Sequence, residues 1–180
     1  SNGNGGDKSI DVQQAYILDS SKIVAWGDNV DGQIMIPDNL NDVIDISANG
    51  NQNLALQKNG NIIAWGKESY GTNDIPEGLN NVIDIDVGVG FNLAVSEDGS
   101  VTGWGSNEYG RLDIPSNLSN VVSVAAGISH GMALNDNGSV TSWGNSEFNL
   151  DSTPVGLEPI KKIDAGYIHS IALTESGTVV

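Results

Sequence analysis

Few side chains in this sequence are of the types that perform covalent chemistry, and none of them is spaced as in a catalytic site. The chain has no cysteine, and its two histidines, His130 and His169, lie 39 residues apart. No Ser-His-Asp set and no singular pair of carboxylates stands out, although hydrolysis and acyl transfer need one such asymmetric arrangement. The sequence therefore predicts a protein that is not an enzyme. A carboxylate pair assembled from distant parts of the chain stays open as the alternative.

Metal and cofactor binding are also weakly indicated. The stretch DNVDG at 28–32 is similar to the start of an EF-hand calcium loop, but the bidentate glutamate of that loop is absent and related stretches do not keep the acids in register. His130 and His169 occupy the same position of a repeat, which favours hydrogen bonding within the fold over metal ligation. We expect no metal and no organic cofactor.

The composition restricts the class of partner. The chain of 180 residues carries 23 acidic and 7 basic side chains, for a formal charge of −16. Such a surface repels phosphate, so nucleic acid and anionic lipid are poor partners. No apolar run reaches the length that spans a membrane. A protein partner with a basic patch fits this charge, and salt should then slow the association.

The chain is built from repeats of constant length. Tryptophan recurs every 39 residues, and prolines, leucines and glycines keep the same step without insertion. A fixed period of this size marks an architecture in which each copy buries its apolar face against its neighbours. The four tryptophans, each followed by glycine, are Trp26, Trp65, Trp104 and Trp143. Since every copy has this pair, we assign it to packing between copies.

Each period reads as a set of short strands. Residues 82–87 alternate apolar and acidic side chains, and residues 91–96 and 100–105 flank an Asp-Gly dipeptide that suits a tight hairpin. A short strand at 72–76 precedes a proline. We therefore predict an all-β protein, a β-propeller of tandem 39-residue four-stranded blades with about four blades present. An open β-solenoid is the alternative.

Function is expected where the copies differ. In an antiparallel blade, the loop after Trp-Gly and the turn after the first strand lie on one face, while the hairpin and the Pro-x-x-Leu turn lie on the other. The first face collects aromatic side chains among acids, a pattern typical of protein-binding surfaces. Packing of these aromatics over neighbouring blades is the competing interpretation. The predicted contact residues are Tyr70, Tyr109, Phe148, Phe91, Tyr167, Glu68, Glu108 and Glu147.

Two stretches carry a family resemblance. GISHGMALNDNGSVTSWGNSEFN at 127–149 and GYIHSIALTESGTVV at 166–180 resemble the repeat of the regulator of chromosome condensation (RCC1) family of seven-bladed propellers. The added IP..L.NV segment looks most like the bacterial branch, which includes the propeller-type β-lactamase inhibitor protein. The resemblance implies a partial or open arc of a seven-bladed ring. It also implies a bacterial, secreted or cell-surface interaction module, with enzyme inhibition as one example of its use.

The two ends of the sequence differ from its middle. Residues 1–10 have the composition of a flexible linker or a cloning scar, and residues 11–180 form the repeat domain. The segments SKIV at 21–24 and GTVV at 177–180 occupy the same repeat positions, so they would duplicate one strand if they met. This favours a fragment of a longer array or an arc completed by another chain. A structural or cell-surface assembly protein that self-associates through its blade edges is therefore the alternative function.

Overall fold

The computed structural model describes residues 23–180, and within this range all regular structure is β except one short 3-10 turn. The strands form four antiparallel sheets, three with three strands and the last with two. The bounds are β1 Val43–Asn49, β2 Gln52–Gln57, β3 Ile62–Gly66, β4 Val82–Val87, β5 Phe91–Ser96, β6 Val101–Gly105, β7 Val121–Ala126, β8 His130–Asn135, β9 Val140–Gly144, β10 Ile160–Ala165 and β11 Ser170–Thr174; the 3-10 turn is η1 Glu108–Gly110.

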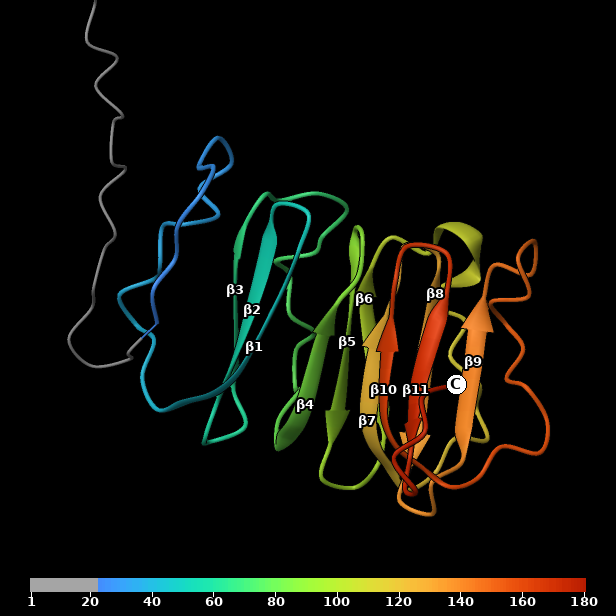
Figure 1. Ribbon diagram of the computed structural model, residues 1–180. Coiled ribbons are helices and arrows are strands. Elements are labelled where there is room, and N and C mark those ends of the chain that lie inside the picture. Colours follow the sequence, from blue (N-terminus) through green and yellow to red (C-terminus); the bar gives the residue numbers. More distant parts are fainter. Residues whose placement is uncertain (1–22) are drawn as a thin grey trace, which may run out of the picture.

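The sheets follow one another in chain order and lie side by side (Figure 1). The first strand of each sheet contacts the first strand of the next, so β1, β4, β7 and β10 line one edge of the array. Each sheet is a meander whose middle strand pairs with both others. The all-β propeller architecture, as an arc of blades, is therefore confirmed. The predictions for residues 1–10 and 11–22 lie outside the described residues.

The predicted fourth strand at 72–76 is wrong, because this segment forms turns and irregular chain. The backbone N–H of Asp74 donates to the carbonyl of Gly71, which closes a turn, and Pro76 has no N–H to offer a ladder. The carbonyl of Thr72 accepts side-chain donors from Gln52, Asn92 and Trp104. The first three blades thus have three strands each, and the segment at 72–76 is held by side-chain hydrogen bonds instead of forming a fourth strand.

The indole of the repeated tryptophan packs between blades. Trp104 and Trp143 are 6% and 4% exposed, and each lies in an apolar cluster shared with a neighbouring blade. A ring of this size removes a large apolar area from water, and its N–H needs an acceptor when it is buried. The packing role is confirmed for these two residues. Trp26 differs, since it is 80% exposed.

Acidic side chains of one blade accept hydrogen bonds from backbone N–H groups at the free edge of the first strand in the next blade. Asp84 of β4 accepts a hydrogen bond from the N–H of Val124 at 2.7 Å, and Asp86 accepts one from Ala126 at 2.7 Å. Both donors lie on β7 of the next blade, where they would otherwise be edge groups without a partner. Burial raises the pKa of Asp84 to about 6, while the bonds from Val124 and Ser123 act in the opposite direction. These carboxylates join blades, so they belong to the scaffold.

Candidate functional site

The two faces of the arc are distinguished by the strand register. Gln52 pairs with Gly66, so the turn after β1 and the loop after Trp-Gly share one face, as predicted. We call it the loop face, and define it by the loops 67–71, 106–110 and 145–149 with the turns 50–51, 88–90, 127–129 and 166–169. The hairpin glycine Gly60 lies at the opposite end of its blade, beside the backbone of Asn81. We call that side the hairpin face.

Tyr70 and Tyr109 hold an uncommon backbone conformation on the loop face. Their φ angles are 58° and 65°, in the left-handed region that bulky residues seldom adopt. Each is followed by a glycine that also has positive φ. The two rings are 74% and 56% exposed, so they are directed outward from the tip of the loop. The surrounding loop maintains a costly conformation while it leaves an aromatic side chain in solvent.

Phe148 occupies the equivalent position of the next copy and is 51% exposed. Here the positive φ falls on the following residue, Asn149, at 56°. The structure therefore brings three exposed aromatic side chains to equivalent loops on the same face. Their exposure argues against the competing interpretation that they pack fully over neighbouring blades.

A groove lies beside Tyr70. It has a volume of about 250 Å³ and is bordered by the turn at Asn51, by Lys67 and by Val89 of the next blade. A Cβ placed on Gly90 would lie 3.5 Å from the ring of Tyr70, an ordinary van der Waals distance, so the ring lies beside this turn. Tyr70 thus lies next to a turn of the neighbouring blade while most of its side chain stays exposed.

Arg111, the only arginine of the chain, forms hydrogen bonds to several segments of the loop face. Its guanidinium donates to the carbonyls of Ser106 at 2.9 Å, Val89 at 2.8 Å and Ile128 at 2.7 Å. It also lies 5.3 Å from the ring centroid of Phe91, a cation–π geometry. One side chain therefore connects the Tyr109 loop with the turns of two blades.

Burial lowers the pKa of this guanidinium, and the nearby Glu108 at 3.8 Å opposes the shift. Arg111 was not among the residues predicted from the sequence. The sequence could have indicated this residue, because Arg111 is the only charged side chain at a repeat position that holds Gln33, Thr72 and Leu150 in the other copies.

The predicted acidic residues are all at the surface of the loop face. Glu68 accepts a hydrogen bond from the N–H of Asn73, and Glu108 pairs with Arg111, so both also order their own loops. Glu147 is exposed beside Phe148. Exposed carboxylates around aromatic side chains form a polar rim of the kind that surrounds a binding surface.

The prediction that Phe91 belongs to the contact surface is wrong, because its side chain is completely buried. Phe91 is the first residue of β5 and packs beneath Arg111, close to Gly88. A Cβ at Gly88 would overlap its ring, so that turn is shaped around the phenylalanine. Tyr167, predicted for the same set, is 67% exposed on the turn before β11. Aromatic side chains at related turns thus point in opposite directions.

The two histidines have different surroundings. His130 is fully buried, and its Nε2 lies 3.0 Å from the hydroxyl of Ser170, whereas His169 is exposed. Burial lowers the pKa of His130, and the proximity of His169 acts in the same direction. Across residues 23–180, no group of three His, Asp or Glu side chains is arranged to hold a metal ion. None of the helical segments in that range is long and apolar enough to cross a membrane.

Comparison with known proteins identifies the repeat. Residues 82–111 and 121–149 match the family model of the regulator of chromosome condensation (RCC1) repeat. No curated protein sequence matches the chain.

Three of the solved structures with a similar fold are compared with this chain. Prp20, the RCC1 protein of Saccharomyces cerevisiae, superposes with a TM-score of 0.65 and 20% identity, over 76% of this chain and 44% of its own. Human WBSCR16 gives 0.64 and 18%, over 76% and 46%. The CRINKLY WD40 ectodomain of the Arabidopsis thaliana receptor kinase ACR4 gives 0.61 and 19%, over 77% and 48%. The chain spans less than half the length of these propellers, and two of its repeats, at 82–111 and 121–149, match the RCC1 repeat model.

Proposed function

We propose that the protein is an interaction module that binds a protein partner through the loop face. The observation that carries this proposal is the pair Tyr70 and Tyr109, each exposed and held at positive φ. Exposed tyrosine on a rigid support supplies a large contact area with little loss of side-chain freedom on binding. Arg111 provides such a support, since it fixes the Tyr109 loop against two neighbouring turns.

The charge of the molecule determines which partner fits. With a formal charge of −16 and exposed Glu68, Glu108 and Glu147 on the loop face, the preferred partner presents a basic patch. Charge complementarity of this kind accelerates association at low salt. Among the fold relatives, yeast RCC1 has been solved with Kap60 bound, and its binding to Gsp1p and histones has been described. These proteins illustrate the use of the fold as a binding scaffold.

At a finer level, we propose a bacterial-type module that acts outside the cell or at its surface, without catalysis of its own. The resemblance of the IP..L.NV segment to the bacterial branch supports this, as does the cysteine-free and lysine-poor composition. An inhibitor-like role, in which the loop face covers part of a target enzyme, is consistent with a surface that offers anchors without a catalytic group. A β-lactamase is the first target to test.

The proposal is tested by measuring affinity for a β-lactamase panel and for any partner isolated with the immobilised chain. Tyr70→Ala, Tyr109→Ala and Phe148→Ala should each leave the fold intact, because all three side chains are exposed. A central anchor should lose about 2 kcal/mol of binding free energy, close to a thirtyfold weaker Kd.

Asn59→Ala and Asn137→Ala on the hairpin face are the matched controls, since each removes one local turn hydrogen bond. Loss of binding in these controls with full affinity in the aromatic variants would assign binding to the other face and contradict the proposal.

A further inference from the structure

One asparagine on the loop face stands where the later copies have glycine. Asn49 is the last residue of β1, and in each later copy a Cβ at the same repeat position would overlap the ring of the residue that follows the turn. In the first copy Gln52 takes the place of that ring, and its side chain is directed to the carbonyl of Thr72. The first copy therefore has room for Asn49, directly before Gly50. The later glycines are Gly88, Gly127 and Gly166.

An asparagine followed by glycine can react without any catalyst. The backbone nitrogen of the glycine attacks Cγ of the asparagine, so that an N–Cγ bond forms while the Cγ–Nδ2 bond breaks, and the amide nitrogen leaves as ammonia with the proton of the glycine N–H. Water then opens the succinimide ring, at Cγ to give aspartate or at the backbone carbonyl to give isoaspartate. Glycine favours the attack because no side chain crowds its nitrogen. The reaction consumes water and leaves a new negative charge on the chain.

Two Asn-Gly dipeptides lie on the hairpin face, and hydrogen bonds restrain both. The N–H of Gly60 donates to the carbonyl of Gln57 at 2.8 Å. Oδ1 of Asn59 accepts the N–H of Asn61 at 3.0 Å, which fixes the side chain. The dipeptide at 137–138 makes the same two bonds, at 3.0 and 2.9 Å. At both sites the glycine nitrogen reaches Cγ only after these bonds open locally.

Gly50 lacks these restraints. Its N–H has no acceptor among residues 23–180, and Oδ1 of Asn49 has no donor there. No heavy atom lies within 4 Å of a Cβ added to Gly50, whereas a Cβ on Gly60 would lie 2.8 Å from the backbone of Asn81. The backbone of Asn49 pairs with Gln52 at the end of the strand, and fraying of this last pair is enough to let the nitrogen turn toward Cγ.

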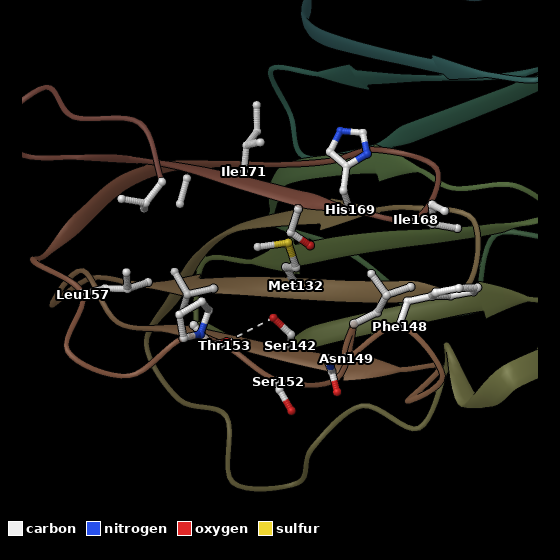
Figure 2. A pocket seen from close by; sticks show the side chains of 16 residues that line it. Met132, Ser142, Phe148, Asn149, Ser152, Thr153, Leu157, Ile168, His169 and Ile171 are labelled. Carbon is white, nitrogen blue, oxygen red and sulfur yellow. Dashed lines mark hydrogen bonds between the residues drawn. The ribbon is translucent and has the colours of Figure 1, made fainter.

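Asn149 provides a comparison on the same face. The N–H of the following residue, Leu150, also has no acceptor in the part of the chain that the structure describes. Both residues line the cavity drawn in Figure 2, and Leu150 is buried. Because its branched side chain crowds the nitrogen, Asn149 should react much more slowly than Asn49. A free nitrogen and a glycine are therefore both needed, and the dipeptide at 49–50 combines them.

We propose that Asn49 is a site of spontaneous deamidation in the folded chain, and that it reacts in preference to Asn59 and Asn137. The product adds a carboxylate to the groove beside Tyr70, which Lys67 also borders. Isoaspartate in addition inserts a methylene group into the backbone of the turn. The loop face thus becomes more acidic as the protein ages.

One consequence for binding rests on the proposed function. A further negative charge beside Tyr70 should accelerate association with a basic partner at low salt. Asn49→Asp reproduces the charge without the longer backbone, so it separates the effect of charge from the effect of the altered turn. Deamidation itself is measured on the chain alone. Failure of the deamidation proposal is therefore distinguishable from failure of the proposed function.

The test is incubation of the full folded chain in mildly alkaline buffer, followed by proteolysis and mass spectrometry. Cleavage after lysine and arginine places the three dipeptides in separate peptides, 23–58, 59–67 and 112–161, and places those of residues 1–10 in another. Deamidation raises the mass of a peptide by about 1 Da. The peptide with Asn49 should convert about tenfold faster or more than those with Asn59 and Asn137, because two hydrogen bonds restrain each of the latter.

The chain in denaturant is the control for effects of the neighbouring sequence. There the three Asn-Gly peptides should convert at similar rates, because the hydrogen bonds of the hairpins are lost. Asn49→Gln should abolish the conversion of peptide 23–58, which assigns it to this residue. Equal rates at Asn49, Asn59 and Asn137 in the folded chain would overturn the proposal. So would conversion of Asn49 in the denatured chain alone, or a preference for Asn49 that denaturant leaves unchanged.

Discussion

The hairpin face and the loop face of the arc are made by the same strands, yet they use their residues differently. On the hairpin face, the hairpin turn is bonded to the strand that begins the next blade: the N–H of Val82 donates to the carbonyl of Gly60, and that of Ile160 to the carbonyl of Gly138, in the same repeat positions. On the loop face, equivalent loops differ in side chain, exposure and backbone angle, as Tyr109 and Phe148 illustrate. Positions that the repeat keeps are therefore committed to joining blades, whereas positions that it varies are available for a partner.

The largest effect is expected from a change on the hairpin face. In Gly99→Ala, the added Cβ would lie 2.8 Å from the backbone N of Asn120, at a residue with φ of 79°. We expect a loss of about 2–4 kcal/mol in the free energy of unfolding, measured by denaturant titration. Gly78→Ala is the control, because Gly78 has a similar φ of 84° and no atom within 4 Å of the added Cβ. It should lose only about 1 kcal/mol. Equal losses would mean that the contact between blades is not the cause.

A smaller effect is expected from a change at Arg111, which stabilises the loop face. Arg111→Met retains much of the apolar stem but removes the bonds to Ser106, Val89 and Ile128. Unfolding free energy should fall by about 1–2 kcal/mol, and the Tyr109 loop should exchange its amide hydrogens faster. The 58–61 hairpin is the internal control, and equal acceleration there would show a global loss of stability instead of a local one.

The raised pKa of Asp84, on β4, predicts that stability depends on pH with a defined sign. The folded-state pKa of Asp84 is about 6, above its ordinary value of 3.8, so between these values the folded chain binds more protons than the unfolded chain. The contribution of Asp84 to stability therefore increases as the pH falls from above 6 toward 4 and is lost as it rises again. Asp84→Asn should flatten this part of the stability profile relative to wild type.

Asp98→Asn is the control for this experiment, since hydrogen bonds from Ser100 lower the pKa of Asp98 and the side chain lies in solvent. Its contribution has the opposite sign, present at neutral pH and lost as the pH falls through its folded-state pKa. A profile that Asp84→Asn leaves as steep as wild type would contradict the assigned role of the buried carboxylate.

The smallest effect is expected from metal removal. A strong chelator should leave the midpoint of thermal unfolding unchanged, because any ligand that binds only the folded state would raise it. A large downward shift, reversed by added calcium, would assign a metal to the acidic loop at 28–32.

The scaffold was predictable from the sequence because every copy repeats its signals. The strands predicted at 82–87 and 91–96 coincide with β4 and β5. The fourth strand was not predictable, since the partners of the Thr72 carbonyl come from side chains on other strands. The loop face was predictable in position but not in detail. Phe91 was assigned to the surface because it is aromatic. Its place in the alternation of β5 and its cation–π contact with Arg111 instead bury its side chain. Trp26 was expected to pack like its counterparts, but its side chain is 80% exposed.

Hydrogen exchange of the chain with and without its bound partner is the most direct test of binding at the loop face, because it compares both faces in one measurement without any mutation. Binding should slow exchange in the loops 67–71, 106–110 and 145–149 and leave exchange in the hairpins 58–61, 97–100 and 136–139 unchanged. Protection confined to the hairpins, with the three loops unaffected, would contradict it.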